Sequence, residues 1–214
     1  MWCDILKCVK MLLHDKLKSY NIILASASPR RRELLAATGI EYRMAEKFEC
    51  EEHYPITLLA EDVAAYLSQL KSHAYPAALS YNDILITADT TVVVDNRVLG
   101  KPRDEEDARR MLGELSGREH VVTTGVTLRM ANAERTFSAK SKVRFATLSD
   151  EQIAYYVEKY SPMDKAGAYG IQEWIGYVGI EGIEGSFYNV MGLPVQRLCS
   201  ELEFFIENLP SCYM

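Results

Sequence analysis

Residues 84–94 have the sequence ILITADTTVVV, an apolar and β-branched run that contains one carboxylate, Asp89. This composition predicts a strand over Asp83 to Val94. Aspartate is unfavoured inside strands, and a buried carboxylate without a partner is costly. A cation or another polar group must therefore compensate Asp89.

A hairpin follows this strand. Asp95-Asn96 is a turn signal, and the chain returns over Arg97 to Gly100. A two-residue turn sets Thr90 across from Lys101, which predicts that Asp89, Thr90 and Lys101 cluster at the open end of the hairpin. The cluster is either part of a reactive site or a simple Asp–Lys pair that fastens the hairpin.

Strands and helices alternate on both sides of this hairpin, which predicts an α/β protein with a mixed, mostly covered sheet, either one domain or two lobes that share the sheet. The length of 214 residues suits this architecture. The other expected strands are Asn21–Ala25, His120–Met130 and Arg135–Ala146. The expected helices are Pro29–Thr38, Leu59–Ser72, one from Asp104 to Gly117, one that begins at the capping box Ser149–Gln152, and Pro194–Glu207. Ser28 should cap the first of these helices, and the second should have an inward stripe of Val63, Tyr66, Leu67 and Leu70.

Composition excludes several classes of function. The net charge of −6 argues against broad nucleic-acid binding, and no apolar stretch is long enough to cross a membrane. The five cysteines lack metal-ligand spacing, and the four histidines show no HExxH or HxH pattern. The start of the chain lacks a signal-peptide core. We expect a soluble cytoplasmic protein with reduced thiols.

The segment from Ser26 to Arg32 predicts an anion site. A strand runs directly into a helix whose first turn holds Arg30, Arg31 and Arg32, although a helix N-terminus favours negative charge. The arrangement makes sense if backbone amides and arginine forks bind the same anion. The alternative is an ordinary capped helix with solvated arginines.

A third segment, Pro162 to Gln172, is rich in small residues around Tyr169. Such residues allow the backbone to approach a ligand closely, and Gln172 offers a donor and an acceptor for a base edge. The alternative is a glycine-rich turn between core elements, which is also our interpretation of Gly192-Leu193-Pro194.

Together these segments resemble the Maf family of nucleoside triphosphate pyrophosphatases, whose fold is similar to that of inosine triphosphate pyrophosphatase. The resemblance spans Asn21 to Ile206 and leaves residues 1–20 as an N-terminal extension to a single domain, 21–214. It rests on residues 24–31 (LASASPRR), 88–90 (ADT), 99–102 (LGKP), 115–117 (LSG) and 163–172 (MDKAGAYGIQ), in this order.

The resemblance implies roles for individual residues. Asp89 is the catalytic carboxylate, either as general base on water or as a ligand of a divalent cation, Mg²⁺ or Mn²⁺. The phosphate contacts fall to four cations with a serine nearby: Arg30, Arg31, Lys71, Lys101 and Ser26. The family has an acidic loop where this chain has Glu49, Glu51 and Glu52. The resemblance does not indicate which of the three belongs to the site.

The loop that ends at Gln172 resembles the branch that acts on dTTP and UTP rather than on 7-methyl-GTP. Gln172, with Thr90 and one of Arg30 or Arg31, would select the pyrimidine. Many relatives continue with glycine where this chain has Glu173-Trp174, and the bulky Trp174 could reshape the base pocket. A homodimer is a further implication.

The expected reaction is attack of an activated water at the α-phosphorus of a nucleoside triphosphate, which releases pyrophosphate. A non-enzymatic nucleotide-binding regulator of cell division would keep the arginines and tolerate the loss of Asp89. A nucleic-acid module using Ser28 to Arg32 is disfavoured, because the chain is acidic and lacks an aromatic-basic stripe.

Overall fold

The computed structural model describes residues 11–209. The predictions for Met1 to Lys10 and for Cys212 lie outside this range. Within it the elements are α1 (Leu13–Lys16), η1 (Leu17–Ser19), β1 (Asn21–Ala25), α2 (Pro29–Ala36), β2 (Arg43–Met44), α3 (Val63–Ala74), β3 (Asp83–Val94), β4 (Arg97–Leu99), α4 (Glu105–Leu115), β5 (Glu119–Arg129), β6 (Glu134–Phe145), α5 (Asp150–Tyr160), η2 (Ala166–Ala168), α6 (Trp174–Gly179), β7 (Ile180–Glu184), α7 (Phe187–Met191) and α8 (Val195–Glu207).

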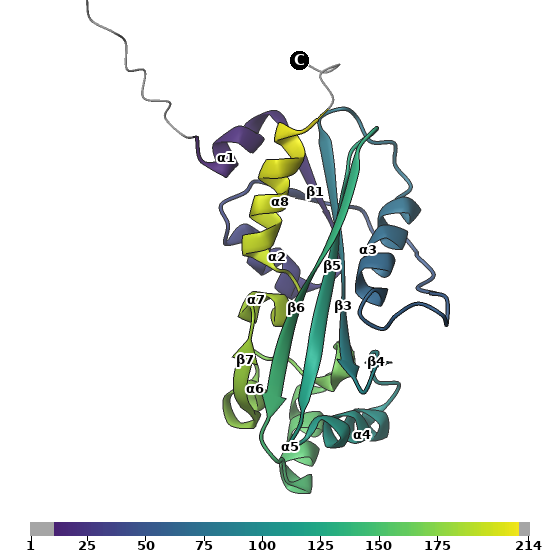
Figure 1. Cartoon of the computed structure of the whole chain (residues 1–214), viewed down its shortest axis with the longest axis vertical. Coiled ribbons are helices and arrows are strands. Elements are labelled where there is room, and N and C mark those ends of the chain that lie inside the picture. The colour runs from purple at the N-terminus through teal and green to yellow at the C-terminus, as the bar shows by residue number, and fades with distance from the viewer. Residues whose placement is uncertain (1–10, 210–214) are drawn as a thin grey trace, which may run out of the picture.

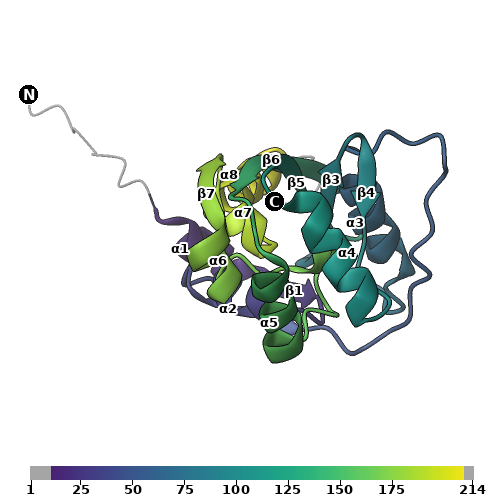
Figure 2. The same ribbon diagram turned by 90° about the horizontal axis from the view of Figure 1, so that it is seen from below.

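A seven-stranded mixed sheet organises the molecule. Its order is β2-β1-β3-β5-β6-β7, with β4 paired to β3. β1 runs parallel to β2 and β3, whereas β3, β5, β6 and β7 pair antiparallel. The long strands β3, β5 and β6 run through most of the molecule, with α3 on one side and α2 and α8 on the other (Figure 1). Seen from below, α4, α5 and α6 gather at one end of the sheet (Figure 2). This mixed, helix-flanked sheet confirms the predicted fold class.

Two main hydrophobic cores lie toward opposite ends of the long strands. One contains side chains of α2 and α8, and the other contains side chains of α4 and α5. β3 passes between them, because Ala88 belongs to the first core and Val92 to the second. The polar residues between the cores form a belt across two paired strands: Asp89, Thr90 and Thr91 on β3, and Thr123 and Thr124 on β5.

Most of the expected elements are present, and several local predictions are confirmed. β1 and β3 have the predicted bounds. Asp95 and Asn96 both have positive φ, as a type I′ turn requires. The capping box at Ser149 is complete, and Asp104 accepts a hydrogen bond from the Asp107 amide.

Some local expectations were wrong, and several elements were not predicted. The second helix begins at Val63, because residues 60–62 form a turn, and its Tyr66 is exposed. Ser28 makes no side-chain cap; instead its own amide donates to Ser26 Oγ (3.3 Å). The glycine-rich stretch after residue 167 contains β7 and two short helices that we did not predict.

No helix within residues 11–209 has both the length and the apolarity needed to cross a bilayer.

Candidate active site

A gap along one edge of β3 creates the site. β1 pairs with β3 only as far as Thr87, and β4 begins to pair at Val92, so no strand borders residues 88–91 on that side. Successive strand residues point to opposite faces, and at this open edge side chains from both faces reach the same space. The gap also lies beyond the carboxyl end of β1, where open α/β sheets commonly bind ligands.

Asp89 faces α3 and meets a lysine there. Lys71 Nζ donates a short hydrogen bond to Asp89 Oδ1 and lies 3.1 Å from Glu52 Oε1. The Lys71 and Asp89 side chains are only 17% and 12% exposed. The compensating cation therefore comes from a helix distant in sequence, and one ammonium group separates two carboxylates.

Close packing of α3 on the sheet places Lys71. A Cβ atom at Gly125, the β5 partner of Asp89, would lie 2.3 Å from the Ala64 backbone of α3. Thr87 Oγ1 donates to the Ser68 carbonyl (2.7 Å), and the Ser68 and Thr127 hydroxyls are 2.9 Å apart. Ser68 and Lys71 lie three residues apart and share a helix face, so these contacts orient the lysine.

Thr90 faces the opposite side and meets α2. Arg31 Nη2 donates to Thr90 Oγ1 (3.0 Å), Nη1 to Ser26 Oγ (3.3 Å) and Nε to the Gly192 carbonyl (2.7 Å). Burial lowers the pKa of the Arg31 guanidinium, partly offset by the Asp89 carboxylate. The group still stays charged at neutral pH. It is thus a fixed cation beside the first turn of α2.

Arg30 lies on the same turn but contacts a different segment. Its Nη1 atom donates to Asp164 Oδ2 (3.2 Å), and Lys165 Nζ donates to Asp164 Oδ1 (2.8 Å). Burial raises the pKa of Asp164, but the hydrogen bond and charge of Lys165 and the charge of Arg30 outweigh it, so the pKa is lowered. Asp164 therefore remains a carboxylate that links α2 to the loop ending at Gln172.

Gln172 contributes an unsatisfied polar group. Its Oε1 atom is buried and accepts no hydrogen bond from any residue between 11 and 209. A buried acceptor without a donor is costly, and this one lies beside a cavity that a ligand could fill. Lys101 is exposed and makes no ion pair with the described residues. Both side chains are free to meet a ligand.

All eight predicted site residues line one cleft of about 780 Å³. They are Ser26, Arg30, Arg31, Lys71, Asp89, Thr90, Lys101 and Gln172. The expected turn register holds from Val92 to Val94, but β4 ends at Leu99 and Lys101 does not pair with Asp89. The interpretation of Asp89–Lys101 as a pair that fastens the hairpin was therefore wrong, because Lys71 takes the place of Lys101 beside the carboxylate.

Sequence reasoning missed other groups at this cleft. Of the three acidic-loop candidates, Glu52 is the one that pairs with Lys71. Asp164 and Lys165 line the cleft although we gave them no role. Their position in the quoted 163–172 segment was the available signal. Trp174 does not line the cleft; its ring packs edge-on against Tyr155, 4.9 Å away.

The donors at Asp89 suit a divalent cation. No group of three or more His, Cys, Asp or Glu side chains that could hold a metal occurs in the part of the chain described. Two carboxylates, Asp89 and Glu52, do converge on the Lys71 ammonium. Mg²⁺ is commonly bound by one or two carboxylates with substrate phosphates and water, so this pair fits such an ion once phosphate is present.

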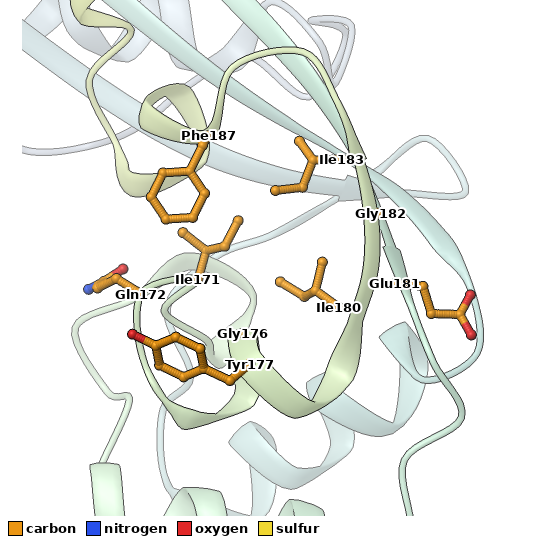
Figure 3. Close-up of a pocket in the computed structure, with 9 residues that line it drawn as sticks. All are labelled: Ile171, Gln172, Gly176, Tyr177, Ile180, Glu181, Gly182, Ile183 and Phe187. Carbon is orange, nitrogen blue, oxygen red and sulfur yellow. The ribbon is translucent and has the colours of Figure 1, made fainter.

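A second, smaller hollow of about 330 Å³ lies behind the Gln172 loop. Ile171, Ile180, Ile183 and Phe187 converge on it in Figure 3, whereas the amide of Gln172 points away. Gln172 lines both cavities. The hollow has an apolar lining and lacks the cations of the cleft, so we place the chemistry in the cleft.

The fold and the cleft define a class of protein: an α/β protein whose cleft gathers cations around the Asp89 carboxylate and suits a polyanionic ligand. From residue 21 to 205 the chain matches the family model described as Maf-like protein, and it therefore belongs to the Maf family. This confirms the family resemblance.

Curated relatives agree with the expected enzyme class. A dTTP/UTP pyrophosphatase of Phocaeicola vulgatus is 54% identical over 189 residues, which cover 88% of this chain and 98% of the relative. A dTTP/UTP pyrophosphatase of Porphyromonas gingivalis is 53% identical over 196 residues, covering 91% and 98%. 

Two solved structures also align with the chain. A nucleoside-triphosphatase / dITP/XTP pyrophosphatase of Mycobacterium abscessus covers 89% of this chain and 99% of its own, at 15% identity and a TM-score of 0.40. A HAM1 protein of Coxiella burnetii covers 86% and 99%, at 14% identity and a TM-score of 0.44.

Proposed function

We propose that this protein hydrolyses dTTP and UTP to the monophosphate and pyrophosphate. The observation that carries the proposal is the cleft itself, where Asp89 lies among cations supplied by α2, α3 and the segment after β4. The names of the relatives described above support the choice of substrates. 

Water attacks the α-phosphorus in this reaction. Where Asp89 acts as the base, it accepts the proton of the water; the bond between the α-phosphorus and its bridging oxygen breaks, and pyrophosphate leaves with the electron pair. Arg30, Arg31, Lys71 and Lys101 offset the charge that develops on the leaving group. Arg31 is already fixed by Thr90, Ser26 and Gly192, so little reorganisation is needed when the phosphates bind.

A divalent cation, Mg²⁺ or Mn²⁺, would be held by Asp89 and Glu52. When bound, it supplies charge neutralisation at the phosphate oxygens. Lys71 contacts both carboxylates, so its ammonium group would give up at least one of these contacts where Asp89 and Glu52 hold such an ion. Asp89 then acts either as the base or as the ligand, as the family resemblance implies.

Gln172 reads the base in this scheme. A pyrimidine presents an N–H donor or carbonyl acceptors on its edge, and the unsatisfied Oε1 atom requires a donor. Thymine and uracil both carry an N3–H group that fits this need. Thr90 has its hydroxyl engaged with Arg31 and, at 2.9 Å, with Thr124, so it contributes by fixing that arginine.

The test is pyrophosphate release from a panel of canonical and modified nucleoside triphosphates with Mg²⁺ or Mn²⁺. We expect turnover of dTTP and UTP, and a loss of at least about 100-fold in Asp89→Asn, the size of a general-base contribution. Asp95→Asn is the matched control, because Asp95 lies in the hairpin turn, away from the cleft, and pairs with exposed Arg118.

Two outcomes would contradict the proposal. A folded Asp89→Asn protein with full activity removes the role of the carboxylate. A folded wild-type protein that binds nucleotides but hydrolyses none favours the non-enzymatic regulator instead.

A further inference from the structure

A buried lysine in the segment that leads to Gln172 pairs with the exposed carboxylate of Asp164 and the mostly buried carboxylate of Glu173. Lys165 is only 7% exposed, and its Nζ atom lies 2.8 Å from Asp164 Oδ1 and 3.2 Å from Glu173 Oε1. A buried ammonium group needs such partners, because an uncompensated charge in this position is strongly destabilising. Glu173, the residue after Gln172, is therefore tied into the interior.

The other oxygen of Glu173 holds the loop from a second direction. Tyr156 donates a short hydrogen bond to Glu173 Oε2, and the Gly170 amide donates to the Tyr156 hydroxyl (2.9 Å). Burial, and then the bond to Glu173, raise the pKa of Tyr156, so its hydroxyl stays protonated and keeps donating. The backbone on both sides of Gln172 is thus connected through one tyrosine.

Close packing at Gly170 restricts where the Glu173 carboxylate can lie. A Cβ atom there would lie 2.8 Å from the carboxyl carbon of Glu173. The Glu173 carboxylate therefore folds back against the loop. Gln172 lines both the large cleft and the hollow of Figure 3. Core packing of Tyr169 and Ile171 anchors the backbone before Gln172, and the hydrogen bonds of Glu173 and Tyr156 add polar contacts around it.

The same ties extend to the phosphate side of the cleft. Asp164 binds Lys165 through one oxygen and Arg30 of α2 through the other. A continuous set of contacts therefore runs from Glu173 through Lys165 and Asp164 to Arg30. It joins the loop that carries Gln172 to the helix that carries the arginines.

We propose that Glu173 is a positioning residue that determines nucleotide specificity: its carboxylate holds Gln172 in register with Arg30, through Lys165–Asp164 on one side and Tyr156–Gly170 on the other. This inference rests on the proposed function. Glu173 does not contact the nucleotide; it sets where the base-reading amide lies relative to the phosphates.

The first test is a kinetic comparison of Glu173→Gln and Tyr156→Phe with wild type, using dTTP, UTP and purine triphosphates. Each variant removes a charge or a hydroxyl and keeps the shape of the side chain. We expect KM for dTTP and UTP to rise about tenfold while kcat changes little, as expected when a charged hydrogen bond that orients ground-state binding is lost. The ratio of kcat/KM for dTTP or UTP to kcat/KM for purine triphosphates should therefore fall.

Two controls separate positioning from simple loss of stability. Glu181→Gln removes a carboxylate on the far side of the hollow, where its partner is exposed Arg144, and should leave KM unchanged. The double variant Glu173→Gln/Tyr156→Phe should raise KM by less than the product of the single effects, because both act through the same contact.

A spectroscopic measurement reports the loop without turnover. The chain has two tryptophans, Trp2 and Trp174, so a Trp2→Phe background leaves only the one beside Glu173. Glu173→Gln should increase acrylamide quenching of Trp174 and weaken dTTP binding without added metal. Glu181→Gln should change neither.

The outcomes distinguish this inference from the proposed function. Hydrolysis by wild type with unchanged KM, discrimination and quenching in folded Glu173→Gln overturns the inference alone. A fall in kcat at constant KM assigns Glu173 a structural role and also overturns it. If wild type hydrolyses no nucleotide, the proposed function fails, and equal dTTP binding by wild type and Glu173→Gln overturns the inference as well.

Discussion

The two ends of the cleft are built differently. At the charged end, Asp89 lies on a strand, Lys71 lies on a helix, and α3 touches β5 at Gly125 with no room for a side chain. At the loop end, Gln172 lies between two cavities, and side-chain hydrogen bonds from Tyr156 and Glu173 hold the chain.

The difference separates two tasks. Regular elements pack rigidly, so the charged end can keep cations and a carboxylate in fixed positions for chemistry. At the loop end, polar contacts of Tyr156 and Glu173 add to the core packing of Tyr169 and Ile171, so one substitution among the polar contacts can change the loop while the apolar side chains stay in place. We infer that changes at the charged end act on turnover and global stability, while changes at the loop end act on binding and specificity.

The largest expected effect comes from Gly125→Ala. The added methyl group would clash with the Ala64 backbone, so α3 must move away from the sheet. Overpacking of this kind costs about 3 kcal/mol, and Lys71 would lose its position beside Asp89. Urea denaturation and pyrophosphate release measure the two effects.

Gly113→Ala is the control for that substitution. Gly113 lies on α4, and a Cβ atom there meets no heavy atom within 4 Å. Because alanine favours helix over glycine, we expect stability to rise by up to about 1 kcal/mol with activity unchanged. Equal stability of the two variants would contradict the close contact between α3 and β5.

Lys71→Met tests the charged end of the cleft directly. The substitution leaves Asp89 and Glu52 without their shared cation and removes one charge from the phosphate site. We expect kcat/KM for dTTP to fall about 100-fold, the cost of removing one preorganised electrostatic contact. Lys140→Met, which breaks an exposed pair with Glu61, should have no such effect.

Sequence reasoning predicted the charged end better than the loop end. The bounds of β3, the turn at Asp95-Asn96 and the arginines at the start of α2 follow from local patterns, and the structure has all three. The neighbour of Asp89 could not be found that way. A lysine 18 residues away reaches it only because α3 packs across the sheet.

The structure of the loop end could not be predicted from the sequence for a different reason. Strand β7 and the helices α6 and α7 lie in a glycine-rich stretch whose pattern is neither alternating nor helical. Lys165 offered no sign of burial, because only its tertiary partners Asp164 and Glu173 make burial possible. The homodimer, the cytoplasmic location and the boundary at residue 20 stay predictions.

Gly167→Ala tests the loop end with a smaller effect. Gly167 has a φ of +67°, and a Cβ atom there would lie 2.9 Å from Val92 Cγ2. The strained backbone costs about 1 to 2 kcal/mol. Because its amide donates to the Gly100 carbonyl (3.0 Å), the change should shift the loop and raise KM more than it lowers kcat. Gly100→Ala, with open space around it, is the control; equal KM values in the two variants would argue against our division of tasks.

A pH dependence of stability is also expected at the loop end. His120 is 2% exposed, and its Nε2 atom lies 2.7 Å from the hydroxyl of Tyr169, the residue before Gly170. Burial lowers the pKa of His120 to about 4, from an ordinary value of 6.5. The folded state therefore favours neutral histidine, and the unfolded state gains a proton first as the pH falls.

The stability that His120 contributes is complete above about pH 6.5 and is lost as the pH falls toward about 4. At about pH 5.5, about one unit below the ordinary pKa of histidine, the loss is about 1.4 kcal/mol, because one pKa unit corresponds to about 1.4 kcal/mol. In His120→Asn the urea midpoint should change less with pH between about pH 6.5 and pH 4.5 than it does in wild type. His73→Asn is the control, because His73 is an exposed residue on α3. A slope that survives in His120→Asn would assign the acid sensitivity to groups away from the loop end.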